Sequence, residues 1–201
     1  ELVHAVGDRR LVAVVGPSGI GKSSVVKAGL VPALRGGALP GSAPWLVTDM
    51  FPGPYPYEEL AAALLRVAVE RPDDLVEELA RDELGIRRVV KRILPPGSEL
   101  LVVVDQFEEL FTLTADEATR RRFLAGLTAL AGDAHSPARV LVTLRADFLD
   151  HPLRDPEFGE RGGEVLRAFR ERVVAAVTRL ALAHRGQCIA EPFTEGGIGS
   201  T

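Results

Sequence analysis

Residues 16–23 read GPSGIGKS and fit the pattern G-x-x-x-x-G-K-[ST]. The pattern stands between an apolar run at residues 11–15, LVAVV, which predicts a strand buried on both faces, and a stretch with helical spacing. Glycines in such a loop let the backbone wrap closely around an anion, so that several N–H groups and the helix start point at one phosphate. In this context the pattern predicts a P-loop that binds a nucleoside triphosphate, rather than a glycine-rich turn that fits by chance.

Two side chains of the predicted P-loop have separate expected roles. Lys22 is expected to reach the β and γ phosphates, and the Ser23 hydroxyl is expected to help hold Mg²⁺. The other residues predicted to bind the nucleotide are Gly16, Pro17, Ser18, Gly19, Ile20, Gly21 and Ser24.

Predicted strands and helices alternate along the chain. Besides residues 11–15, the apolar runs that predict strands are residues 45–48, 100–104 and 140–144. Helical spacing predicts helices at residues 22–34, with a bend near Pro32, and at 57–69, 73–81, 84–94 and 117–131. This alternation predicts an α/β fold in three layers, a mostly parallel sheet with helices on both faces. We expect a core domain at residues 1–158 and an atypical C-terminal segment at 159–201, partly helical with a flexible end.

Asp105 directly follows the apolar run LLVVV. A carboxylate at the tip of a central strand is where a P-loop protein places a Mg²⁺ ligand, so we predict that Asp105 binds Mg²⁺ together with Ser23. The alternative is an aspartate that caps the next turn.

Two glutamates, Glu108 and Glu109, come shortly after Asp105. A glutamate in this place can polarise a water for attack on the γ-phosphate, and we slightly favour Glu109 over Glu108 as that base. The alternative is a solvated acidic helix start, since carboxylates stabilise the first turn of a helix.

Arg145 ends the third strongly apolar run, VLVTLR. A guanidinium at a strand tip is suited to bidentate contact with a phosphate oxygen, which predicts a catalytic role. The alternative is a structural ion pair with Asp147 or Asp105. Asp147 itself fits a capping or arginine-orienting role better than a catalytic one.

Composition argues against several classes of protein. The net charge of −4 gives no basic footprint for nucleic acid or an anionic membrane. The single cysteine, Cys188, excludes an intramolecular disulfide, and the four histidines lie too far apart for a compact metal motif. No apolar run approaches the roughly 20 residues that cross a bilayer, and the first residues, ELVHAVGDRR, lack the layout of a signal peptide. We therefore expect a cytoplasmic protein.

Three strings carry a family resemblance: VAVVGPSGIGKSSVVKAGLVPAL, LLVVVDQFEELFTL and VLVTLRADF. Over about residues 11–150 the chain resembles the STAND group of signal-transduction ATPases, specifically the branch called novel STAND NTPase 1. The resemblance implies a P-loop fold of the additional-strand (ASCE) type, in which the strand ending at Arg145 lies between those ending at Gly16 and Asp105. It also implies ATP over GTP as the nucleotide, because the sequence lacks the guanine-reading motif N-K-x-D.

The chain also departs from the pattern of that family. The family's FxGR-like motif, which helps hold adenine, would lie before Glu1, and Arg179 stands where a strand like VxPL has proline. The family's helical, winged-helix and partner-sensing segments are not in this sequence. We expect the core of a larger machine, or a truncated copy, with protein partners or neighbouring domains and with oligomerisation on activation.

The sequence is compatible with three functions. The first is a nucleotide-operated signalling switch that binds ATP and Mg²⁺ and hydrolyses ATP slowly. The second is a turnover ATPase of the AAA+ kind. The third is a remnant with weak nucleotide binding.

Overall fold

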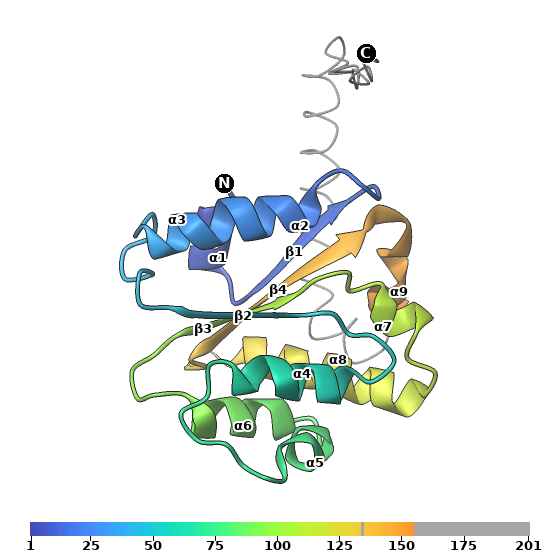
Figure 1. Ribbon diagram of the computed structural model, residues 1–201. Coiled ribbons are helices and arrows are strands. Elements are labelled where there is room, and N and C mark those ends of the chain that lie inside the picture. Colours follow the sequence, from blue (N-terminus) through green and yellow to red (C-terminus); the bar gives the residue numbers. More distant parts are fainter. Residues whose placement is uncertain (134, 155–201) are drawn as a thin grey trace, which may run out of the picture.

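A central sheet of four parallel strands organises the computed structural model, which describes residues 1–133 and 135–154 (Figure 1). The strands are β1 (Leu11–Gly16), β2 (Leu46–Met50), β3 (Leu100–Val104) and β4 (Ala138–Arg145). Their order is β1-β4-β3-β2, and all three neighbouring pairs are parallel. Strand β4, which ends at Arg145, therefore lies between β1, which ends at Gly16, and β3, which Asp105 follows. The family resemblance implied this order.

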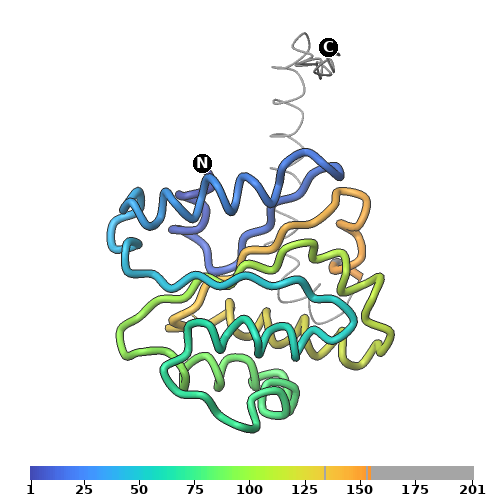
Figure 2. The backbone as a smooth tube through the Cα atoms, viewed as in Figure 1, coloured from blue at the N-terminus to red at the C-terminus, as the bar shows by residue number. Residues whose placement is uncertain are grey.

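Helices cover both faces of this sheet, which confirms the three-layer α/β fold (Figures 1 and 2). In both views the blue N-terminal helices lie on one side, and the green and yellow helical segments lie on the other. The described helices are α1 (Leu2–Asp8), α2 (Lys22–Ser24), the π-helical η1 (Val25–Leu30), α3 (Val31–Arg35), α4 (Pro56–Leu65), α5 (Leu75–Ala80), α6 (Gly85–Ile93), α7 (Glu109–Thr112), α8 (Glu117–Gly132), the 3₁₀ helix η2 (Ala146–Phe148) and α9 (Asp150–Arg154).

The core has two parts because side chains alternate across the sheet. Leu101 and Val103 of β3 pack with Val6 of α1 and with the helical stretch that follows the P-loop. The alternate residues of β3 face the larger cluster, which contains side chains from α4, α5, α6 and α8. All five residues of β3 are buried, as expected of a central strand in a parallel sheet.

The helix predicted at residues 22–34 is present but is not a uniform α-helix. Its middle part, η1, has π-helical hydrogen bonds, and the Val31 N–H donates to the Val26 carbonyl five residues earlier. Pro32, at the start of α3, has no N–H and so cannot continue an α-helical ladder. Val25, which the apolar pattern included, is 52% exposed, whereas Val26 is fully buried.

The other predicted elements are present with shifted ends. β2 extends past the predicted residue 48 to Met50, and α4 ends at Leu65 instead of residue 69. The short helices α1, α7 and α9 were not predicted. None of the described helices combines the length and the apolar character needed to span a bilayer. The predicted domain boundary at 158 and the C-terminal segment at 159–201 lie outside the described residues.

Candidate nucleotide-binding site

The predicted site residues gather at the carboxyl edge of the sheet. Gly16 ends β1, Asp105 directly follows β3, and Arg145 ends β4. Gly16 and Arg145 are direct partners in the register of β1 and β4. Since parallel strands end at the same edge, three segments far apart in the sequence meet there, which is where α/β sheets bind ligands.

The P-loop backbone requires glycine at two positions. Gly19 and Gly21 have φ values of +76° and +90°, in the left-handed region that other residues rarely adopt. A Cβ added at either position would meet no atom within 4 Å, so backbone conformation rather than space selects glycine here. Gly21 is the residue before α2, and the loop residues Pro17, Ser18 and Ile20 are exposed. Ser24, at the end of α2, is exposed as well.

The Lys22 side chain folds back over the loop. Its ammonium donates to the Gly16 carbonyl over 3.0 Å and to the Pro17 carbonyl over 2.9 Å. The charge that is expected to reach phosphate is thus hydrogen-bonded to the first two carbonyls of the loop.

Ser23 and Asp105 are joined directly, although 82 positions separate them. The Ser23 hydroxyl donates to Oδ1 of Asp105 over 2.7 Å, and the Thr143 hydroxyl donates to the same oxygen over 2.6 Å. The backbone N–H of Gln106 also donates to Oδ1, over 3.1 Å. Asp105 is 2% exposed. Its burial raises the pKa of the carboxyl, but the hydrogen bonds from Thr143 and Ser23 and the nearby charge of Lys27 outweigh burial and lower that pKa.

These oxygen donors fit Mg²⁺. A hydroxyl and an ionised carboxylate are hard oxygen ligands, and Mg²⁺ in nucleotide sites takes one or two carboxylates together with phosphate oxygens and water. Within the described ranges, no group of three or more histidine, cysteine, aspartate or glutamate side chains could hold a metal ion. Ser23 and Asp105 supply two oxygen ligands of the kind that Mg²⁺ takes together with phosphate oxygens.

Lys27 and Asp49 belong to this edge but were not predicted. The Lys27 ammonium lies 3.1 Å from Oδ2 of Asp49 and 3.5 Å from Oδ2 of Asp105. It also lies 5.1 Å from the centre of the Phe51 ring. The hydrogen bond to Asp49 is the main cause of a raised pKa for Lys27. Neither residue belongs to a motif, and Asp49 lies in the part of β2 beyond the predicted end at residue 48.

Thr143 is a third residue that sequence reasoning missed. Its hydroxyl accepts from the Gln106 N–H over 3.0 Å while it donates to Asp105. The signal was present, since Thr143 is the only polar residue inside the apolar run VLVTL.

The two glutamates point to different partners. Oε2 of Glu108 accepts from the backbone N–H of Arg145 over 3.2 Å, so this carboxylate lies beside the end of β4. Oε2 of Glu109 accepts from the Gly53 N–H over 3.3 Å, in the loop between β2 and α4. Glu109 is also the first residue of α7, which agrees with the alternative of an acidic helix start.

Arg145 forms an ion pair with Asp147, which was one of the alternatives for this residue. Its Nε and Nη2 donate to the two carboxylate oxygens of Asp147 over 3.1 and 2.7 Å. This bond raises the pKa of Arg145 and lowers the pKa of Asp147, which also feels the charge of Lys22. The arginine therefore lies at the predicted place, with its guanidinium held by its own loop.

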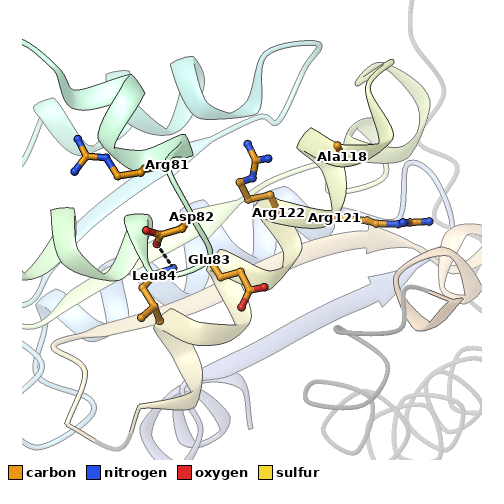
Figure 3. A pocket seen from close by; sticks show the side chains of 7 residues that line it. All are labelled: Arg81, Asp82, Glu83, Leu84, Ala118, Arg121 and Arg122. Carbon is orange, nitrogen blue, oxygen red and sulfur yellow. Dashed lines mark hydrogen bonds between the residues drawn. The ribbon is translucent and has the colours of Figure 1, made fainter.

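A separate hollow of about 610 Å³ lies between the α5–α6 turn and the first turns of α8 (Figure 3). Figure 3 shows acidic and basic side chains around it, and Asp82 accepts from the Leu84 N–H on its rim. None of its lining residues belongs to the predicted nucleotide site. They are Arg81, Asp82, Glu83, Leu84, Ala118, Arg121 and Arg122.

Two solved structures are partly similar to this chain. The ORC2 protein of Aeropyrum pernix, solved as ADPNP-ADP complexes, is 15% identical to this chain, with a TM-score of 0.45. The match covers 83% of this chain and 43% of the ORC2 chain. The cytoplasmic domain of the type VII secretion ATPase EccC of Thermomonospora curvata is 19% identical to this chain, with a TM-score of 0.39. The match covers 76% of this chain and 18% of the EccC chain. The chain thus spans less than half the length of either protein.

No curated protein matches the sequence. The profile of the family described as Novel STAND NTPase 1 matches residues 1–198, nearly the whole chain. The P-loop geometry, the strand order β1-β4-β3-β2 and this match lead to one assignment. The chain belongs to the novel STAND NTPase 1 family.

Proposed function

We propose that this chain binds ATP with Mg²⁺ and acts as a nucleotide-operated signalling switch that hydrolyses ATP slowly. The observation that carries the proposal is the hydrogen bond of 2.7 Å from Ser23 Oγ, in the last residue of the P-loop, to Asp105 Oδ1. In a P-loop site a serine and an aspartate at these positions would hold the Mg²⁺ that accompanies the nucleotide.

In this proposal the loop backbone binds the phosphates and Lys22 supplies the charge. The ammonium exchanges its contacts with the Gly16 and Pro17 carbonyls for the β and γ phosphate oxygens. Ser23 and Asp105 would hold Mg²⁺, which would supply positive charge against the negative charge of the phosphates. The choice of ATP over GTP rests on the missing guanine-reading motif.

We propose Glu108 as the residue that polarises water for hydrolysis, although the sequence slightly favoured Glu109. The Glu108 carboxylate lies against the backbone of Arg145, whose register partner Gly16 begins the P-loop. The Glu109 carboxylate contacts Gly53, in the loop after the outer strand β2. A base must come within reach of the γ-phosphate, which favours the glutamate beside β4.

Arg145 supplies the two states that a switch requires. Its guanidinium is bound to Asp147 by two hydrogen bonds, and a γ-phosphate close to Gly16 would compete for the same donors. ADP lacks that phosphate and so leaves the arginine with Asp147. This difference in contacts is what lets a nucleotide shift a conformational equilibrium.

The test is a calorimetric titration with Mg²⁺-ATP, Mg²⁺-ADP and Mg²⁺-GTP, combined with measured phosphate release. A switch binds ATP tightly and turns over slowly until a partner is present. Brisk basal hydrolysis would instead support a turnover ATPase. Failure of saturating Mg²⁺-ATP to raise the melting temperature would support a remnant and sink the proposal.

We further propose a cytoplasmic switch that works with protein partners or neighbouring domains, not with nucleic acid, and that oligomerises on activation. Residues 1–158 form the nucleotide-binding core in this proposal, and residues 159–201 form a separate segment. A chain ended at residue 158 should keep its Mg²⁺-ATP affinity, which calorimetry checks. Light scattering with ADP and with a non-hydrolysable ATP analogue tests the oligomeric state.

A further inference from the structure

Lys27 connects two carboxylates that come from different strands. Asp105 follows β3, Asp49 lies in β2, and the Lys27 ammonium bridges them at 3.5 and 3.1 Å. Arg66 makes a second ion pair with Asp49, at 3.8 Å, on the side of α4. The four side chains form a row of alternating charge that ends at the proposed Mg²⁺ ligand.

The two oxygens of Asp105 have different surroundings. Oδ1 accepts three hydrogen bonds, from the Ser23 and Thr143 hydroxyls and from the Gln106 N–H. Oδ2 faces Lys27, and among the described residues this ammonium is the cation in ion-pair contact with it. The Lys27 ammonium is therefore placed to hold Oδ2, while the three other donors hold Oδ1.

Burial makes this contact important. Asp105 is 2% exposed, and a buried carboxylate needs hydrogen bonds or an opposite charge to remain ionised. The Lys27 side chain is 45% exposed, so it supplies that charge from the solvent side without being buried itself. Its position is fixed at the other end by Asp49, and its ammonium is flanked by the Phe51 ring.

We propose that Lys27 is a positioning residue for the Mg²⁺ site, which holds Oδ2 of Asp105 and ties it to Asp49. This inference rests on the proposed function, because it assigns a role toward the cation that Ser23 and Asp105 would bind. Lys27 does not touch the nucleotide in this proposal. It keeps the carboxylate plane in the orientation that the cation requires.

The test measures how strongly Mg²⁺ improves ATP binding, by calorimetry of the full chain with Mg²⁺ and with EDTA. Lys27→Met keeps the aliphatic stem but removes the charge, and should reduce the Mg²⁺ improvement about tenfold. Its ATP affinity in EDTA should stay within about twofold of the wild type, because no phosphate contact is lost. Lys27→Arg keeps a cation and should retain most of the improvement.

Arg66→Met is the matched control. It removes the other cation on Asp49 without touching Asp105, and its Mg²⁺ improvement should match the wild type within about twofold. Asp49→Asn removes the outer anchor of Lys27 and should give an intermediate loss. A melting curve shows whether Lys27→Met folds. If it does not fold, the Mg²⁺ improvement of Asp49→Asn tests the positioning role of Lys27 in its place.

Several results would overturn the inference. One is a folded Lys27→Met chain that keeps the full Mg²⁺ improvement. Another is a folded Lys27→Met chain with a larger improvement, because the Lys27 ammonium would then compete with Mg²⁺ for Asp105. If Arg66→Met lost as much of the Mg²⁺ improvement as Lys27→Met, the effect would come from packing of α4. If Asp49→Asn kept the full improvement, Asp49 would not anchor Lys27. A wild-type chain whose ATP binding ignores Mg²⁺ would instead overturn the proposed function itself, and this inference with it.

Discussion

Gly16 and Arg145 face each other across the register of β1 and β4, so the first residue of the P-loop and the strand-tip arginine are neighbours. The arginine is nevertheless bound to Asp147, two positions further along its own chain. Asp147 and a γ-phosphate would compete for the Arg145 guanidinium. Arg145 should therefore distinguish a nucleotide that has a γ-phosphate from one that lacks it.

Arg145→Met should therefore weaken ATP binding about tenfold and leave ADP binding nearly unchanged, because the lost hydrogen bonds are to a charged group present in ATP alone. Asp147→Asn should act in the opposite direction and favour ATP over ADP, since it releases the guanidinium. Calorimetry with the two nucleotides measures both effects. Equal changes for ATP and ADP would show that Arg145 supports the loop but does not sense the γ-phosphate.

Lys22→Ala should reduce ATP affinity about 10- to 150-fold, the effect of losing a hydrogen bond to a charged group worth about 1.5–3 kcal/mol. Lys91→Ala is the matched control, because Lys91 pairs with Asp133, which Arg87 also contacts. That control should bind ATP like the wild type. An unchanged affinity in Lys22→Ala would exclude the phosphate role of this lysine.

Glu108→Gln should retain ATP binding and lose hydrolysis, whereas Glu109→Gln should retain both. The reason is that the amide keeps the size of the side chain but cannot accept a proton from water. Phosphate release under single-turnover conditions measures the chemical step separately from product release. The reverse pattern, with hydrolysis lost in Glu109→Gln alone, would return the base to the residue that the sequence favoured.

Asp116 should make the stability of α8 depend on pH. Its carboxylate caps this helix, and the Thr119 hydroxyl and the N–H groups of Thr119 and Ala118 donate to it. These bonds, led by the one from the Thr119 hydroxyl, lower the pKa of Asp116 below its ordinary value. The stabilisation is thus fully present above the unfolded pKa of about 3.9 and is lost as pH falls through the folded pKa.

The measurement for Asp116 is the melting temperature of the wild type and of Asp116→Ala from pH 7 to pH 3. The variant should melt lower at pH 7, and the difference should shrink below about pH 4. Asp116→Asn, a neutral residue that also caps well, should lose less than alanine at pH 7. A difference between wild type and alanine that is constant over this range would show that the charge does not contribute.

The parts of the site that follow from strand ends could be predicted from the sequence. Gly16, Asp105 and Arg145 each stand at the end of an apolar run, and a parallel sheet brings such ends to one edge. The order of the strands came from the family resemblance, since alternation of strands and helices is compatible with several orders.

Lys27 and Asp49 could not be predicted in the same way. Apolar periodicity ended the outer strand at residue 48, which leaves Asp49 in a loop, whereas ladder pairing of Met50 with Val104 extends the strand. Helical spacing likewise does not reveal the π-helical turns that follow the P-loop.

The two glutamates show a further limit of sequence reasoning. Glu108 and Glu109 are adjacent and chemically alike, and only the path of the backbone separates them. Gln106 has a φ of +50° in the turn that precedes them, after which Glu108 accepts from Arg145 at the end of β4 and Glu109 accepts from Gly53 in the loop after β2. No pattern of residue types marks that turn in advance.

The π-helical segment also fixes the length of the chain between the phosphate loop and the hydrophobic core. Val26, Leu30 and Leu34 are buried, and each lies four residues after the one before. A regular α-helix rotates about 100° per residue, so from Val26 to Leu34 it would turn about 80° more than two full turns. The wider turns of η1 take up part of that surplus. Exposed Ala28 and Gly29 should therefore tolerate many side chains but no deletion, because removing one residue would rotate the loop against the core by about 100°.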